Sequence, residues 1–278
     1  MPVVIVGASG LVGRSLLPAL AARSPEVRAV VRRRDAAEPL RALGAKVAVD
    51  DLSDPASLAV PFQDAHTLVH LAGGLAATDI EDANLGTVER TLASAADAGL
   101  RRVLFLSYPG AGGAAANPYL RAKGRAEEAI RASGLQHAIV RATHVYGPGS
   151  RWLAQTAQAA RRRMVLGSGD QRMAPVFVED VAAVLAAADD RATEISGTFG
   201  LEGPDLVTAD ELAELLAGRR RRLHVRPGGP LAALVVRRVP AHVLEILAAD
   251  SRADAPDAAR EFAAPRTPLA EGLRRSRG

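Results

Sequence analysis

The sequence predicts an α/β fold in which a doubly wound parallel sheet carries helices on both faces. One observation is that apolar runs of strand length alternate along the chain with stretches of helix length. Such alternation is typical of βαβ units, whose crossovers are right-handed. A second observation is the glycine-rich turn Gly7–Gly13, which follows the first apolar run and opens the first helix. Its position is that of a nucleotide-binding turn in such a sheet.

The strands and helices are expected in a regular order over the first 218 residues. Apolar runs predict strands at residues 3–6, 27–31, 46–49, 68–71, 102–107, 137–141 and 197–201. The intervening stretches predict helices at residues 11–23, 36–43, 80–98, 119–133, from 179 onward and at 209–216. Asn117 is placed to cap the helix at 119–133, and Pro118 is tolerated in its first position.

Beyond residue 218 the pattern loosens into arginine, proline and alanine. We therefore expect an NAD(P)-binding domain over residues 1–218, with segment 148–174 contributing to the substrate side. Residues 219–278 are expected to form a small substrate lobe that does not fold alone. The apolar spacing within residues 231–247 favours a wall of this lobe over a segment lying on a membrane surface.

Composition excludes several classes of function. The 278 residues include 35 basic and 31 acidic side chains, for a net charge of +4, and only 3% are aromatic. Nucleic-acid binding favours basic residues interleaved with stacking aromatics, so no nucleic-acid partner is expected. The absence of cysteine excludes disulfides, thiol catalysis and cysteine-ligated metals, and the histidines lack a metal-ligand spacing.

The chain also lacks an uncharged run of about 18 residues, the length that a membrane helix requires. No metal and no membrane partner are therefore expected. We expect a soluble cytoplasmic protein that acts on a small molecule, and a homodimer is compatible with the sequence.

The turn Gly7–Gly13 has the pattern G-x-x-G-x-x-G. Its glycines permit a tight turn and a close approach of the backbone to a pyrophosphate, and the helix that follows offers amide groups and positive potential. The candidate cofactor-binding residues of this turn are Gly7, Ser9, Gly10, Leu11, Val12 and Gly13. A purely structural glycine turn is the alternative.

Three arginines follow the second expected strand. A carboxylate at this place binds the ribose hydroxyls of NAD, whereas an arginine accepts the additional phosphate of NADP. Arg32 and Arg33 therefore predict that NADP(H) is preferred, with NAD(H) as the alternative cofactor. The competing interpretation is that these arginines only cover a helix end.

A tyrosine and a lysine are spaced for acid–base chemistry. Lysine is rare in this chain, and Lys123 follows Tyr119 by four positions, so the two share one helix face. An ammonium lowers the pKa of a neighbouring phenol, which can then act as a general acid or base. Ser107 ends the strand before this helix, and side chains at the carboxyl ends of parallel strands point into the ligand crevice. We expect Ser107, Tyr119 and Lys123 to form a catalytic set.

Together these motifs resemble the short-chain dehydrogenase/reductase superfamily, specifically its extended and atypical members, which have the Rossmann fold. The resemblance covers residues 3–189, and residues 119–149 are most similar to relatives of the respiratory complex I accessory subunit and to bacterial nucleotide-sugar epimerase/dehydratase relatives. Besides the glycine turn and the Tyr-x-x-x-Lys pair, it rests on Asp50–Asp54, His70–Gly73, Asn84-Leu85-Gly86-Thr87, Val140–Gly149 and Val176–Ala182.

The resemblance implies a role for each residue of the site. Tyr119 would donate or accept the proton, Lys123 would hold the nicotinamide ribose and lower the pKa of Tyr119, and Ser107 would polarise the substrate oxygen. Asn84, taken alone, fits a polar packing position equally well. The implied cofactor contacts are Asp51 and Leu52 at the adenine, Leu71, Ala72 and Gly73 along the cofactor, Asn84, and Thr143 and Val145 at the nicotinamide.

The sequence thus favours an NADPH-dependent oxidoreductase that reduces a carbonyl of a small organic substrate, or oxidises the alcohol. Two alternatives stay open: a nucleotide-sugar epimerase or dehydratase with a tightly held cofactor, and a non-catalytic NAD(P)-binding sensor or structural subunit. Pro109 stands where epimerase-like members carry a second serine or threonine, which weakens the first alternative. The retained Ser, Tyr and Lys set argues against the second.

Overall fold

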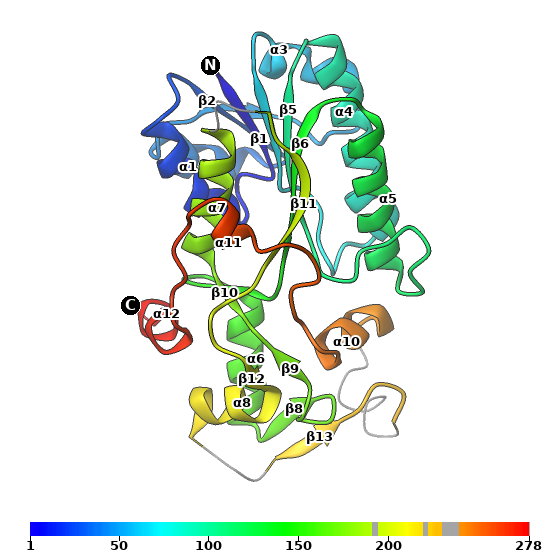
Figure 1. The fold of residues 1–278 in the computed structure, drawn as a ribbon, viewed down its shortest axis with the longest axis vertical. Helices are drawn as coiled ribbons and strands as arrows, with labels where there is room; N and C mark the ends of the chain where they lie inside the picture. Colours follow the sequence, from blue (N-terminus) through cyan, green and yellow to red (C-terminus); the bar gives the residue numbers. More distant parts are fainter. Residues whose placement is uncertain (191–193, 219–221, 230–238, 278) are drawn as a thin grey trace. The chain divides into compact units, whose positions relative to one another are not determined.

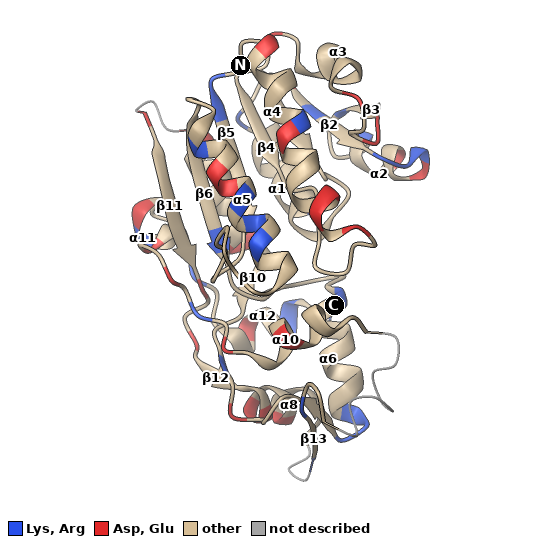
Figure 2. Ribbon diagram, turned by 90° about the vertical axis from the view of Figure 1, so that its right-hand side faces the viewer, with Lys and Arg blue, Asp and Glu red and all other residues tan. Residues whose placement is uncertain are grey.

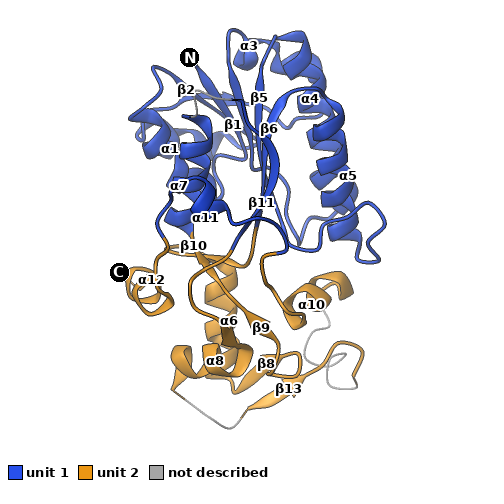
Figure 3. Cartoon of the chain, viewed as in Figure 1, with its two compact units in different colours: residues 1–141, 178–201, 254–265 blue, residues 142–177, 202–253, 266–278 orange. Residues whose placement is uncertain are grey.

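The computed structural model describes the chain except residues 191–193, 219–221, 230–238 and 278 (Figure 1). It divides into two compact units (Figure 3). Unit 1 consists of residues 1–141, 178–201 and 254–265, and unit 2 of residues 142–177, 202–253 and 266–278.

This division differs from the one expected after residue 218. Segment 148–174 belongs to unit 2, and residues 254–265 belong to unit 1, because the chain passes from one unit to the other several times. Within the apolar stretch 231–247, residues 231–238 lie outside the described part. Its end forms helix α10 (Ala241–Ala248).

Unit 1 contains a sheet that, among the described residues, has seven strands in the order β11-β6-β5-β4-β1-β2-β3. All the pairs from β3 to β6 are parallel. Its elements are β1 (Val3–Val6), α1 (Leu11–Ala21), β2 (Val27–Val31), η1 (Arg34–Ala36), α2 (Ala37–Arg41), β3 (Lys46–Val49), η2 (Pro55–Leu58), α3 (Ala59–Phe62), β4 (Thr67–His70), η3 (Asp82–Gly86), α4 (Thr87–Asp97), β5 (Arg102–Ser107), α5 (Pro118–Ala132), β6 (Gln136–Ala142), α7 (Val178–Asp189), β11 (Ser196–Leu201) and α11 (Ala258–Glu261).

Helices cover both faces of this sheet, as Figure 1 shows for α1 and α7 on one face and α4 and α5 on the other. On the second face, Leu92 of α4 and Ile130 of α5 share a core with Val103 and Phe105 of β5. The strands β1 and β4 are buried along their whole length. Burial on both faces explains why these strands are continuous apolar runs without polar alternation, and it confirms the predicted fold class.

The predicted strands at 3–6, 27–31, 46–49 and 102–107 have the observed bounds, whereas the fourth begins one residue early, at Thr67. The helix predicted at 80–98 is interrupted. After a short helical start at residues 80 and 81 it widens into a π-helix, η3, and the α-helix α4 follows from Thr87. Such widened turns are frequent at functional sites.

Unit 2 consists of short strands and helices around a second core that contains Tyr146, Phe177 and Leu212. Among the described residues of the whole chain, no helix is both long and apolar enough to span a bilayer. The elements of unit 2 are β7 (Val145–Tyr146), α6 (Arg151–Arg161), β8 (Met164–Leu166), β9 (Arg172–Met173), β10 (Val176–Phe177), β12 (Val207–Thr208), α8 (Ala209–Ala217), β13 (Leu223–Val225), α10 and α12 (Leu269–Arg275).

Candidate cofactor-binding and catalytic site

The glycine turn lies between β1 and α1, against the end of β4. Gly7 has a φ of +79°, and a Cβ at this position would lie 2.6 Å from the backbone nitrogen of Ala72. Only glycine fits here, because both the left-handed backbone and the close approach exclude a side chain. The turn therefore brings its backbone beside Leu71 and Ala72, two of the predicted cofactor contacts.

The start of α1 has the properties of an anion site. Gly10 occupies the N-cap position, where it makes no side-chain hydrogen bond, and the first turn holds no acidic residue. Ser9 and Gly10 are exposed. The first amides of a helix lack partners within the helix and attract negative charge. The residues present thus fit the pyrophosphate of a dinucleotide.

The arginines after β2 differ in whether their side chains form ion pairs. Arg33 is exposed and pairs with Asp35, with 2.9 Å between Arg33 Nε and Asp35 Oδ1. This carboxylate raises the pKa of Arg33 above its ordinary value. Arg32 is also exposed but has no hydrogen bond or ion pair with any residue that the structure describes. Of the two predicted phosphate ligands, Arg32 is therefore the one whose guanidinium is not already engaged.

Asp51 and Leu52 follow β3, as predicted, but their side chains lie in different surroundings. Asp51 is exposed and accepts a hydrogen bond from the Ser53 amide. The side chain of Ser53, and after it this amide, lower the pKa of the Asp51 carboxyl. Leu52 has a left-handed backbone, with φ of +63°, and its side chain belongs to the apolar core of unit 1. Within unit 1, the Leu52 side chain serves packing.

Asn84 holds the loop after β4. Its Oδ1 accepts from the amide of Gly74 at 3.0 Å, and its Nδ2 donates to the carbonyls of Gly74 at 3.2 Å and Ile80 at 2.9 Å. The residue is fully buried within the π-helix η3. Because its amide is engaged by backbone groups, Asn84 fixes Gly73 and Gly74 in place, which is the polar packing role that the sequence left open.

Tyr119 and Lys123 lie on one face of α5, as their spacing predicts. The helix is capped by Asn117, whose Oδ1 accepts from the Tyr119 amide at 3.0 Å, and Pro118 occupies its first position. Lys123 is buried, with its Nζ donating to the Leu106 carbonyl at 3.0 Å and lying 4.5 Å from the centre of the Phe105 ring. Burial lowers the pKa of Lys123 to about 8, and Glu127 opposes this shift.

The pKa of Tyr119 moves in the direction opposite to the one expected. Burial raises it well above the ordinary value, and the neighbouring Tyr108 raises it further. The rings of Tyr108 and Tyr119 meet edge to face with their centres 6.1 Å apart. Lys123 does not offset these effects, because its ammonium is directed to the Leu106 carbonyl. Tyr119 is therefore a protonated phenol at neutral pH.

Ser107 ends β5 next to this pair, as predicted, but its hydroxyl is directed to a residue that the sequence did not suggest. Ser107 Oγ donates to Glu127 Oε1 at 2.7 Å. Glu127 is only 1% exposed and accepts further hydrogen bonds from two arginines. Arg141 donates through Nε at 2.9 Å and Nη2 at 2.7 Å, and Arg131 donates through Nη2 at 2.7 Å. A buried carboxylate is tolerated when it is paired in this way.

A sequence signal for Glu127 did exist. It follows Lys123 by four positions and so continues the helix face that begins with Tyr119. Arg141 stands near the end of β6, the strand beside β5, so its side chain reaches the same edge of the sheet. Neither residue has a recognisable motif spacing to Ser107, and the pairing became visible only in the fold.

The network extends to the loop between Ser107 and Tyr119. Arg141 Nη2 donates to the Ala111 carbonyl at 2.8 Å, and its Nη1 donates to Asp254 Oδ2 at 3.0 Å. The same Asp254 oxygen accepts from the Gly110 amide at 2.7 Å. Asp254 thus contributes to the candidate site from a distant part of the sequence, and no local sequence pattern predicts this contact.

The same loop packs directly on α5. A Cβ at Gly124 would lie 2.2 Å from the carbonyl carbon of Gly112, so the helix and the loop touch backbone to backbone. The Gly112 amide also donates to the Leu120 carbonyl at 3.2 Å. This contact accounts for the glycine that follows Lys123, because a side chain at Gly124 would collide with the backbone of the loop.

His70 is a further buried group at the end of β4. It is 1% exposed, its ring lies 5.8 Å from that of Phe105, and neither ring nitrogen makes a hydrogen bond within the described chain. Burial lowers its pKa to about 3, with a smaller effect from Lys123. The imidazole is therefore neutral, and the nearby ammonium keeps it so.

Thr143 and Val145, the predicted nicotinamide contacts, lie in unit 2. Thr143 Oγ1 donates to the Ala174 carbonyl at 2.6 Å, and Val145 pairs with Val176 between β7 and β10. Between them, His144 stacks on Trp152 at 4.8 Å, and burial lowers the pKa of His144 to about 4. These contacts are internal to unit 2, so the role of Thr143 and Val145 toward a cofactor stays a prediction.

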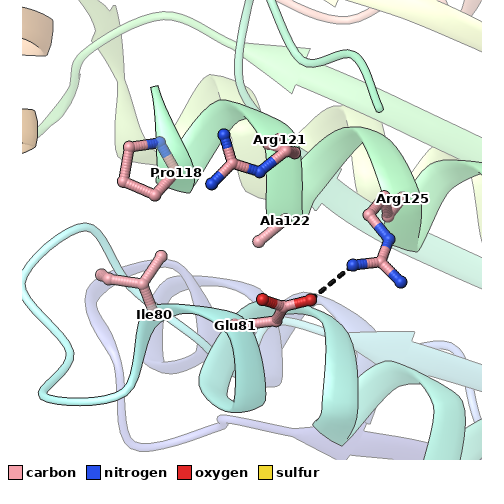
Figure 4. A pocket seen from close by; sticks show the side chains of 6 residues that line it. All are labelled: Ile80, Glu81, Pro118, Arg121, Ala122 and Arg125. Carbon is pink, nitrogen blue, oxygen red and sulfur yellow. Dashed lines mark hydrogen bonds and ion pairs between the residues drawn. The ribbon is translucent and has the colours of Figure 1, made fainter. Parts of the chain in front are cut away.

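A cleft beside the start of α5 lies on another face of that helix (Figure 4). Glu81 and Arg125 form an ion pair across it, and both are exposed. Figure 2 shows both signs of charge along the outer surface of α5. The cleft is lined by Ile80, Glu81, Pro118, Arg121, Ala122 and Arg125. No group of histidine, aspartate and glutamate side chains among the described residues is arranged to hold a metal ion.

Comparison with protein families gives a match over residues 7–191 to a model described as NAD(P)H-binding. Two curated relatives are a ceramide reductase of Caulobacter vibrioides and the mitochondrial NADH dehydrogenase [ubiquinone] 1 alpha subcomplex subunit 9 of Arabidopsis thaliana. The first is 35% identical over 66% of this chain and 60% of its own length. The second is 30% identical over 76% of this chain and 56% of its own length. The chain thus spans somewhat more than half the length of these relatives.

The fold is also shared with solved structures at lower identity. The triphenylmethane reductase of Citrobacter sp., determined as a complex with NADP(H), has a TM-score of 0.80 at 20% identity, covering 99% of this chain and all of that one. Proteins described as sugar epimerases are among the similar proteins as well. These likenesses agree with the Rossmann architecture and with the resemblance recognised in the sequence.

Proposed function

The chain belongs to the NAD(P)H-binding family of atypical short-chain dehydrogenase/reductase proteins, and on this premise we propose that it is an NADPH-dependent carbonyl reductase. The substrate is a small organic molecule whose carbonyl group is reduced to an alcohol. Two relatives support reduction over other chemistry, since their names describe a ceramide reductase and a ketoreductase.

The observation that carries this proposal is the Tyr119–Lys123 pair on α5. Tyr119 is buried on the capped helix, and its raised pKa keeps the phenol protonated. A protonated phenol is a proton donor, which is the group that a carbonyl oxygen needs as it becomes an alcohol oxygen. Tyr119 gives this proton to the substrate oxygen, and water returns a proton to the phenolate.

The cofactor is held by the glycine turn and the start of α1. The amides at Leu11, Val12 and Gly13 bind the pyrophosphate, and Arg32 binds the additional phosphate of NADPH. Lys123 keeps the ribose of the nicotinamide in place as a buried ammonium. When bound, the reduced nicotinamide supplies the hydride that the carbonyl carbon accepts. The protein contributes orientation and the proton.

The proposal is tested by following the absorbance of reduced nicotinamide with purified full chain and a panel of aldehydes and ketones. Tyr119→Phe keeps the ring but removes the proton donor, so kcat falls by about 1,000-fold. The Kd for NADPH, measured by fluorescence, stays within about twofold, since the turn is untouched.

The matched control is Tyr146→Phe, which removes a phenol hydroxyl in the core of unit 2 and leaves unit 1 unchanged. Full activity of Tyr119→Phe on a substrate that the wild type reduces would refute the proposed mechanism. Tightly held dinucleotide that co-purifies, with no net NADPH oxidation, would favour the epimerase alternative instead.

A further inference from the structure

The loop that follows β3 has a backbone conformation that depends on its surroundings. Leu52 is left-handed, with φ of +63°, and its side chain is 4% exposed in the apolar core of unit 1. Residues other than glycine are uncommon in this conformation and keep it only where neighbouring groups fix it, often beside ligands. The Leu52 amide is fixed within the loop, because it donates to Asp50 Oδ1 at 2.7 Å.

Arg90 of α4 fixes the other end of the Leu52 peptide. Its Nε donates to the Leu52 carbonyl at 2.5 Å, and its Nη1 donates to Asp82 Oδ1 at 2.8 Å. A guanidinium has donors in several fixed directions, so it can hold a carbonyl and a carboxylate at once. A second bond from α4 reaches the same segment, since Ser94 Oγ donates to the Pro55 carbonyl at 2.7 Å. Helix α4 therefore holds the loop after β3 at two points.

The carboxylate that orients Arg90 belongs to the π-helix η3. A Cβ at Gly86 would lie 2.5 Å from Asp82 Oδ1 and 3.0 Å from Arg90 Nη1, so this ion pair fills the space that a side chain would need. Asn84 of the same π-helix holds Gly74 in the loop after β4. Through η3 and Arg90, the loops after β3 and β4 are thus connected, and both carry predicted cofactor contacts.

We propose that Arg90 is a positioning residue of the cofactor site, which holds the loop after β3 in the shape that receives the adenosine end of NADPH. The Leu52 side chain is buried, so the loop offers a ligand its backbone and the exposed Asp51 carboxylate there. A loop that already has its bound shape loses less conformational entropy on binding. The inference rests on the proposed cofactor site, because the adenine contacts come from the family resemblance.

Arg28 of β2 gives a matched control in the same unit. Its guanidinium pairs with Glu26 and donates to the carbonyls of Pro61, at 3.0 Å, and Gln63. Its side chain is 18% exposed, close to the 25% of Arg90. It lies near the start of β2, whereas the glycine turn follows the end of the parallel strand β1. Its removal breaks contacts of the same kind at the opposite edge of the sheet.

The test measures the Kd of the full chain for NADPH and for adenosine 2′,5′-bisphosphate, which keeps the adenosine end of the cofactor, by isothermal titration. Arg90→Met keeps an apolar stem but removes both hydrogen bonds, so both Kd values rise by about tenfold. Arg28→Met lowers the melting temperature by a similar amount, about 4 °C, but keeps both Kd values within about twofold. With a carbonyl substrate of the wild type, Arg90→Met raises KM for NADPH and keeps kcat within about twofold.

A second variant tests the connection to η3. Asp82 is 54% exposed at its side chain, so Asp82→Ala keeps the fold. It frees the Arg90 guanidinium on one side, and both Kd values rise by about threefold. In the double variant with Arg90→Met the loss equals that of Arg90→Met alone, because the two residues act through one contact.

Two outcomes overturn the inference. One is a pair of wild-type Kd values in Arg90→Met or, should that variant not fold, in Asp82→Ala. The other is an equal loss of affinity in Arg28→Met, which would mean that general stability and not the shape of this loop governs binding. A wild-type chain that binds neither ligand would refute the proposed cofactor site itself, which is a separate result.

Discussion

The candidate site has two halves, one formed mainly by backbone groups and the other by buried side chains. The cofactor half, around Gly7 and the start of α1, consists of backbone: a left-handed glycine, a close contact with Ala72 and uncapped amides. The catalytic half, around Ser107 and α5, consists of buried side chains that hold one another, with Glu127 receiving bonds from three residues.

This difference decides how each half responds to mutation. A backbone site depends on a few residues that lie close together in the sequence. A cluster of buried charges is interdependent, because removal of one member leaves the others buried without a partner. Substitutions in the catalytic half should therefore cost stability, whereas those in the cofactor half should cost affinity.

The largest expected effect is a loss of stability in Glu127→Ala. The variant leaves Ser107 and two arginines without their carboxylate acceptor. We therefore expect the free energy of unfolding to fall by about 3 kcal/mol. Denaturant unfolding measures it. The control is Glu81→Ala, which breaks the exposed ion pair with Arg125 (Figure 4) and should cost less than about 0.5 kcal/mol. Similar losses in both variants would show that the catalytic half is not the interdependent cluster described above.

A smaller effect is expected in the cofactor half with Arg32→Ala. Loss of an unengaged guanidinium should weaken NADPH binding by about tenfold, or about 1.4 kcal/mol, while NADH binding changes little. Isothermal titration with each cofactor gives both constants. Arg33→Ala is the control, because Arg33 is already paired with Asp35 and should matter less. If Arg32→Ala kept the wild-type preference for NADPH over NADH, the alternative interpretation, that these arginines only cover a helix end, would hold.

The smallest expected effect is a pH dependence of NADPH binding that follows the charge of Lys123. Burial lowers the pKa of Lys123 to about 8, so its ammonium is charged below that pH and loses its proton as the pH rises through it. Affinity for NADPH should therefore fall by about fourfold between pH 7 and pH 8.5. Fluorescence titration measures this slope. Lys123→Met should bind more weakly and with a flat profile, and a persisting slope in that variant would assign it to another group.

The sequence was sufficient for the local structure of the glycine turn and for the helix that bears Tyr119. The glycine turn and the cap at Asn117 were read correctly because each is a local pattern with a local cause. The fold class followed from the same kind of signal. The π-helix η3 was missed because the hydrogen bonds of Asn84 to Gly74, ten residues away in the chain, leave no periodic trace.

The catalytic half was predicted only in part, for a physical reason. The direction of the Ser107 hydroxyl depends on Glu127, Arg141 and Asp254, and the last lies 144 positions from the Gly110 amide that it receives. The expected effect of Lys123 on Tyr119 failed for a similar reason, since a spacing of four fixes the helix face but not where an ammonium points. Burial, which governs both pKa values, is a property of the whole fold.

The return of residues 254–265 to unit 1 has a consequence for the order of events during synthesis. Elongation at about 5–20 residues per second lets early domains fold before later ones emerge from the ribosome. The strands and the glycine turn are complete in the nascent chain long before Asp254 appears, yet the Gly110 amide in the loop between Ser107 and Tyr119 is bound by that carboxylate. A growing chain thus acquires its nucleotide turn early and its finished chemistry last.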